Sequence, residues 1–215
     1  QYIVSTSATA TPNTTIANGG TVTISGVTGT YYVVVKTCDK AGNCKTQASN
    51  PFYLDNTATT ITLGKNGNST YAKTGSTTVT ASDAHVTLNT LKYAISTNTS
   101  PASTEYTTMT SGGTVNITGK TGTYYVVIQA CDSLGNCKTQ ASNPFYMDNG
   151  VPTITYGTNG NSAYVKSASS TVTVNANTGE INTIKYIVST SNTATPTTTI
   201  ANGGTVTISG VTGTY

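Results

Sequence analysis

The side chains with the most distinctive chemistry in this sequence are four cysteines, which form two pairs of the pattern Cys-Asp-x-x-Gly-Asn-Cys. A three-residue loop with its glycine in the left-handed conformation would pair the aspartate with the asparagine. That register sets the two cysteines opposite each other at a non-hydrogen-bonded position, where the short Cα separation suits a disulfide. We therefore predict two disulfides, Cys38–Cys44 and Cys131–Cys137, which indicate an oxidising compartment.

Zinc bound by thiolates is the competing interpretation of the cysteines. It requires four sulfur atoms to converge on one ion. The two pairs lie 93 positions apart in a repetitive sequence, so they fall in different repeats. The spacing favours disulfides, and we expect no metal at the cysteines.

A single histidine, His85, and seven acidic residues are the other groups capable of acid–base chemistry or metal binding. They form no recurring acid–base pair, so no catalytic site is predicted. Asp55 and Asp148 stand 93 positions apart and, together with Asp39, Asp83 and Asp132 in predicted loops, raise the question of a calcium-clamped linker. Such a site needs several carboxylates in one shell. We predict instead that these aspartates cap turns, that His85 lies in an exposed loop, and that the chain carries no metal or cofactor.

These residues recur because the sequence is repetitive. Residues 45–53 recur letter for letter as residues 138–146, and residues 1–31 match residues 185–215 with three differences. A self-match of this length indicates a tandem array. The predicted parts are the C-terminal part of a first repeat (1–57), a complete second repeat (58–150) and the N-terminal part of a third (151–215), as expected of an excerpt from a longer chain.

The second repeat alternates apolar and polar residues in short segments separated by Gly, Asn and Ser. The predicted strands centre on Ile61, Val79, Leu91 and Val115, and a long strand over residues 123–131 precedes a final one. Pro144 in the final strand indicates an edge or a bulge. About seven short strands suit an all-β, immunoglobulin-like Greek-key sandwich.

Two segments carry a more specific resemblance. Residues 29–43 read GTYYVVVKTCDKAGN and residues 50–58 read NPFYLDNTA. They resemble the bacterial immunoglobulin-like repeats of large surface proteins, which end with a Gly-x-Tyr strand, an Asp-x-Ala-Gly-Asn turn and an Asp-Asn-Thr-Ala-Pro linker. Thr59 stands where that family usually has proline, and Gly150 and Val151 replace Thr-Ala. The resemblance spans the chain and implies tandem sandwiches arranged end to end.

Composition argues against several functions. All ten basic residues are lysines scattered singly, so the net charge of +3 forms no stripe for a nucleic acid backbone. No apolar run reaches the roughly 20 residues of a membrane span. The chain has no tryptophan, which a carbohydrate-binding module would normally expose.

The sequence thus predicts a non-enzymatic structural segment of a bacterial extracellular stalk or filament, located outside the cell or on its surface. Its expected partners are other copies of the chain or adjacent repeats. The alternative is a cell-surface adhesin whose immunoglobulin-like domains bind a host or glycan ligand. The candidate ligand loop is then the connector 96–111, which is two residues longer than its counterpart in the third repeat.

Alternation along the long strand predicts a further surface. If Tyr31, Val33 and Val35 point into the core, Tyr32 and Val34 point outward. Tyr125 and Val127 stand 93 positions after Tyr32 and Val34, so they fall on the same side in the second repeat. The predicted lateral association surface consists of Tyr32, Val34, Tyr125 and Val127. The alternative interpretation is ordinary surface, because Tyr and Val favour strands wherever they lie.

Overall fold

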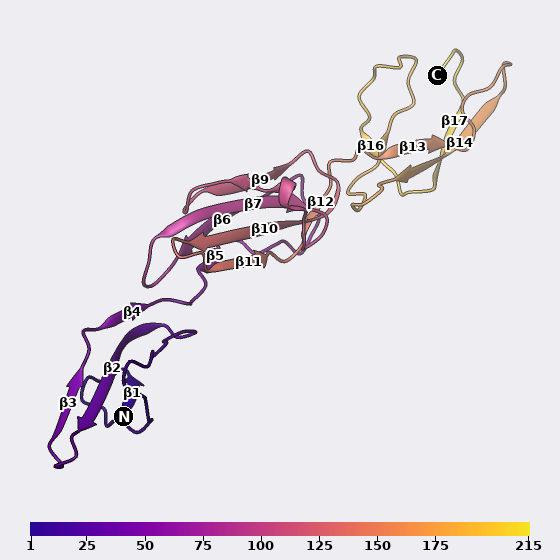
Figure 1. The fold of residues 1–215 in the computed structure, drawn as a ribbon. Helices are drawn as coiled ribbons and strands as arrows, with labels where there is room; N and C mark the ends of the chain where they lie inside the picture. The colour runs from indigo at the N-terminus through magenta and orange to yellow at the C-terminus, as the bar shows by residue number, and fades with distance from the viewer. The chain divides into compact units, whose positions relative to one another are not determined.

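The computed structural model describes all 215 residues and is drawn as a ribbon in Figure 1. The residues divide into two compact units. The first unit comprises Gln1–Lys65, Thr77–Val115 and Val126–Ser142, and the second comprises Asn66–Ser76, Asn116–Tyr125 and Asn143–Tyr215. Regular structure consists of antiparallel strands and one short 3-10 helix, η1 (Ser103–Glu105), so the all-β prediction is confirmed. No helix is long and apolar enough to cross a membrane.

The N-terminal sheet belongs to the first unit. Its strand order is β1 (Tyr2–Ser5), β2 (Gly29–Cys38) and β3 (Cys44–Ala48). A short strand, β4 (Phe52–Leu54), pairs with the first residues of β2. β2 therefore has a paired strand along its whole length, and strands on both sides at Val34 and Val35.

The strands of the second repeat form two sheets. One has the order β5 (Thr60–Leu63), β6 (Thr74–Ser82), β9 (Thr114–Thr118), and the other has the order β11 (Cys137–Ala141), β10 (Gly122–Asp132), β7 (Leu88–Ser96), β8 (Thr107–Thr108). β6, β9 and β10 each begin in one unit and continue into the other. The strand positions match those that the alternation of apolar residues predicts.

The buried residues follow the period of two that a half-covered strand requires. Along β6, Gly75, Thr77, Val79 and Ala81 are buried and the residues between them are exposed. The centre of β10 differs, because consecutive residues on both of its faces are buried. This pattern fits a β-sandwich with β10 as an inner strand.

The second unit contains the remaining strands. β12 (Phe145–Met147) pairs with residues 122–124 of β10. Beyond it, β13 (Thr153–Tyr156), β14 (Ser167–Asn175) and β17 (Gly204–Ser209) form a three-stranded sheet, and β15 (Lys185–Tyr186) pairs with β16 (Thr198–Thr199).

A bulge separates β11 from β12. Val127 pairs with Ala141 and Tyr124 with Phe145, so residues 142–144 stand opposite residues 125–126. The Ser142 hydroxyl accepts a hydrogen bond from the Val126 amide at 2.9 Å, in place of a backbone carbonyl. The bulge contains Pro144, as predicted, and Ser49 accepts from the Val33 amide in the same way at 3.0 Å in the first repeat.

Candidate functional site at the repeat junctions

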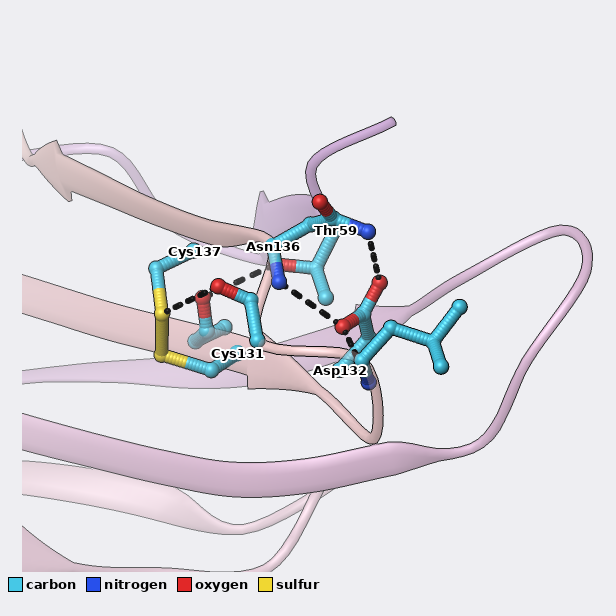
Figure 2. Close-up of a disulfide and its surroundings, with 8 residues drawn as sticks. Thr59, Cys131, Asp132, Asn136 and Cys137 are labelled. Atoms are coloured by element: carbon cyan, nitrogen blue, oxygen red, sulfur yellow. Dashed lines mark hydrogen bonds between the residues drawn. A yellow bond between two sulfur atoms is a disulfide. The ribbon is translucent and has the colours of Figure 1, made fainter. Parts of the chain in front are cut away.

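Both predicted disulfides are present. Cys38 and Cys44 are joined with a Cα separation of 4.0 Å, and Cys131 and Cys137 with one of 4.1 Å. Each pair occupies directly opposite positions of its hairpin, as the turn geometry predicts. No cysteine is free. Figure 2 shows the second disulfide beside the tip of the β10–β11 hairpin.

Asp132 organises that hairpin tip. Its Oδ1 accepts hydrogen bonds from the backbone amides of Leu134 (2.8 Å) and Asn136 (2.9 Å), and its Oδ2 accepts one from the Asn136 side chain (2.8 Å). Gly135 closes the loop with φ of 90°, a conformation that glycine adopts readily. Burial of Asp132 opposes ionisation, but the hydrogen bonds from Asn136 and the backbone outweigh it and hold the pKa of this carboxyl below its usual value.

Asp39 makes the same arrangement at the exposed tip of the β2–β3 hairpin. Its two oxygens accept hydrogen bonds from the Asn43 amide (2.8 Å) and the Asn43 side chain (2.9 Å). The Asn43 side chain is the main cause that lowers the pKa of Asp39. Gly42 has φ of 91°, so the two turns match.

The second hairpin also binds the linker that precedes its own repeat. The Asn136 side chain donates a 3.2 Å hydrogen bond to the Asp55 carbonyl, and the Thr59 hydroxyl donates a 3.2 Å bond to the Ala130 carbonyl. Thr59 is fully buried and is visible beside Asn136 in Figure 2. Proline, which the resembled family usually has at this position, would lack that donor. Residues 55–59 are thus attached to the stapled hairpin at both ends.

Asp55 lies at the centre of this first junction. Its Oδ1 accepts hydrogen bonds from the Thr57 hydroxyl (2.5 Å) and the Thr57 amide (3.0 Å). These bonds, the hydroxyl first, lower the pKa of Asp55, so the group is ionised at neutral pH. The side chain is only 3% exposed, and its Oδ2 is buried without a hydrogen-bond partner.

A loop of the second repeat brings two more ligating groups to Asp55. The Nδ1 atom of His85 lies 3.8 Å from Asp55 Oδ1, and one ligand atom each of Asp55, Asp83 and His85 lies within 4.8 Å of the others. Asp83 Oδ1 accepts hydrogen bonds from the amides of His85 (2.9 Å) and Val86 (3.3 Å). Both aspartates cap turns, as predicted, and His85 is 46% exposed in its loop. Their convergence was missed, since no local pattern places Asp83 and His85, which stand 28 and 30 positions after Asp55, beside it.

The second junction has a linker aspartate, Asp148, but no counterpart of Asp83 or His85. Asp148 Oδ1 accepts a hydrogen bond from the Gly150 amide at 2.9 Å. A Cβ atom on Gly179 would lie 2.5 Å from Asp148 Oδ2, so this carboxylate faces the corresponding loop. Ala176 and Thr178 stand 93 positions after Asp83 and His85, and the Thr178 hydroxyl is buried without a partner.

The predicted association surface requires a correction. Val34 and Val127 are 0% exposed, while Tyr32 and Tyr125 are half-buried. Val34 lies on a strand flanked by β1 and β3, and Val127 lies on one flanked by β11 and β7. The outward face predicted from alternation is therefore wrong at both valines: in β2 Val34 is buried while its neighbour Val35 is 39% exposed, and in β10 Val126 and Val127 are both buried.

The comparison of the chain with protein families, curated proteins and solved structures finds no match. The functional argument therefore depends on the repeat, the hairpins and the junctions themselves.

Proposed function

We propose that this chain is a structural segment of a bacterial extracellular stalk or filament, built from tandem immunoglobulin-like Greek-key sandwiches arranged end to end. Its parts are the end of one repeat (1–57), a complete repeat (58–150) and the beginning of another (151–215). The observation that carries the proposal is the linker 55–59, which hydrogen bonds attach to the disulfide-stapled hairpin of the repeat that follows it.

The same linkers are attached to the repeat that precedes them. The Asn56 amide and side chain donate to the Thr28 hydroxyl (2.9 Å) and the Val27 carbonyl (2.7 Å). Asn149 does the same with Thr121 (3.1 Å) and Lys120 (2.7 Å). A short connection that is hydrogen-bonded along its length has little of the freedom of a flexible tether. Repetition of this arrangement supports a spacer whose stability is a sum over repeats and junctions.

Location and chemistry follow the same proposal. Disulfides persist in oxidising environments, which favours a place outside the cytoplasm and, for this proposal, the cell surface. The carboxylates of Asp39, Asp55, Asp83, Asp132 and Asp148 serve as acceptors in turns, so the proposal assigns the chain no catalysis. Its partners would be other copies of the chain or adjacent repeats.

One observation supports the adhesin alternative. The long connector 96–111 forms the exposed helix η1, in which the Glu105 carboxylate accepts a 2.8 Å hydrogen bond from the Ala102 amide. An ordered, exposed loop that is longer in this repeat than in the next is a suitable place for a surface ligand, host protein or glycan.

Small-angle X-ray scattering tests the spacer function. We expect the chain in solution to be extended, and we expect Thr59→Val combined with Asn136→Ala to increase its flexibility without unfolding it. The matched control is Thr60→Val with Asn43→Ala, because Thr60 is exposed and Asn43 donates within its own turn. A compact particle whose repeats fold back on each other would contradict the proposal.

Immunogold labelling of source cells tests the location, and labelling confined to the cytoplasm would exclude a surface stalk.

A further inference from the structure

The first junction contains a buried carboxylate oxygen for which the protein supplies no partner. Asp55 Oδ1 accepts hydrogen bonds from the amide and the hydroxyl of Thr57. Asp55 Oδ2 accepts none, although the side chain is only 3% exposed. Leaving a charged oxygen desolvated and unpaired is unfavourable. A cation at this position would remove that cost.

The surrounding groups form a ligand set. The potential ligand atoms of Asp55, Asp83 and His85 lie within 4.8 Å of one another. The backbone hydrogen bonds to Asp83 hold the loop that carries His85. Two carboxylates and one imidazole suit a borderline divalent ion, whereas calcium prefers oxygen ligands only.

One of the three pair distances is close to that of a bound ion, and the other pairs, within 4.8 Å, require the ligands to move inward. Zinc bond lengths of about 2.0–2.2 Å place two ligand atoms of a tetrahedral ion about 3.4 Å apart. The His85 Nδ1 to Asp55 Oδ1 distance is 3.8 Å, and His85 is 46% exposed, so its ring has room to rotate inward. The same exposure would admit a water molecule as the fourth ligand.

We infer that Asp55, Asp83 and His85 bind one zinc-class divalent cation, which ties the linker after β4 to the loop after β6. This inference replaces the sequence-based expectation that the junctions carry no metal. It stands independently of the spacer function, because the linker bonds of Thr59 and Asn136 do not involve these ligand atoms.

The second junction is a control within the same chain. Asp148 corresponds to Asp55, but Ala176 and Thr178 stand where the first junction has Asp83 and His85. It retains a single carboxylate, which is too few ligands for a zinc site. The chain is therefore expected to bind one ion with high affinity.

Calorimetric titration of untagged, chelator-treated protein with Zn²⁺ tests the inference. We expect saturable binding of one ion per chain, and we expect His85→Thr with Asp83→Ala to abolish it. These are the residues of the third repeat at the same positions, so the fold should tolerate them. The reciprocal variant, Ala176→Asp with Thr178→His, should raise the stoichiometry to two. His85→Ala alone should weaken binding at least about tenfold.

Three results would overturn the inference: no saturable heat with the native chain, unchanged Zn²⁺ binding in the Asp83→Ala, His85→Thr variant, or Ca²⁺ binding more tightly than Zn²⁺. Circular dichroism of each variant verifies that a lost signal reflects the missing ligands. Scattering of the zinc-free protein addresses the spacer function separately, so either proposal can fail alone.

Discussion

At the scale of single residues, Asp39 and Asp132 occupy the same position of a turn but differ in burial. Asp39 and Asp132 each accept hydrogen bonds from the backbone and side-chain amides of the asparagine in their turn pattern, and Asp132 accepts one more from the Leu134 amide. Asp39 is exposed and Asp132 is fully buried. A buried acceptor that loses its ionised form leaves its donors without a replacement from water, so the two turns should differ in sensitivity.

Asp132→Asn is expected to lower the melting temperature more than Asp39→Asn. The new side-chain amide would face the Asn136 amide, donor against donor. Because the folded pKa of Asp132 is lowered, its contribution is fully present above the ordinary aspartate value of about 3.9 and is lost as the pH falls through the folded pKa. Calorimetry at about pH 7 and about pH 2 should therefore show a gap in melting temperature between wild type and Asp132→Asn that is smaller at the lower pH. A gap that is equal at both pH values would contradict this account.

At the scale of elements, the β10–β11 hairpin carries both a disulfide and the linker contacts. The crosslink closes a loop with a sequence separation of 6, so its effect on the unfolded chain is small. The strand pairing runs from Val127–Ala141 to Cys131–Cys137, so the crosslink lies at one end of it. The disulfide therefore stabilises the tip rather than the sheet.

Replacing Cys131 and Cys137 with serine should reduce the free energy of unfolding by roughly 2 kcal/mol and leave the sheet intact. Urea unfolding followed by circular dichroism measures the loss. The rate of amide hydrogen exchange should increase at the hairpin tip before it increases along β10. The corresponding double substitution at Cys38 and Cys44 is the control, with the same loop length. Collapse of the whole sheet on removal of the disulfide would show that the crosslink is required for the fold.

At the scale of the whole molecule, one sequence occurs in two environments. Residues 45–53 and 138–146 are identical, yet Phe52 is 46% exposed and Phe145 is 0% exposed, because residues 1–57 hold only the predicted C-terminal part of a repeat and contain no counterpart of β6. Phe145 packs against the start of β6, where a Cβ atom on Gly75 would lie 3.0 Å from its ring. The glycine makes room for the aromatic ring.

Phe145→Ala should destabilise its unit by about 3–5 kcal/mol, since it removes a buried ring and leaves a cavity. Phe52→Ala, the same change in the same motif, should cost far less because half of that ring is already in water. Urea unfolding of the two variants makes the comparison. Equal losses would mean that Phe52 is covered in solution as fully as Phe145.

Local patterns by themselves determined the strands, the turns and the disulfides of this protein. The period of two placed β5, β6, β7, β9 and β10, and the Cys-Asp-x-x-Gly-Asn-Cys pattern predicted the register that joins Cys131 to Cys137. Pro144 marked the bulge. These features depend on neighbouring residues and on backbone conformation, which a sequence states directly.

Only the tertiary structure decided what covers each face and which distant groups meet. Alternation separates the two sides of β10, but it does not reveal that Val127 is buried as deeply as Val126, because the covering segments come from elsewhere in the chain. In the same way, Asp55 meets Asp83 and His85 through the path of the linker past the loop after β6. Burial and ligand geometry depend on contacts between segments, and no local pattern specifies those contacts.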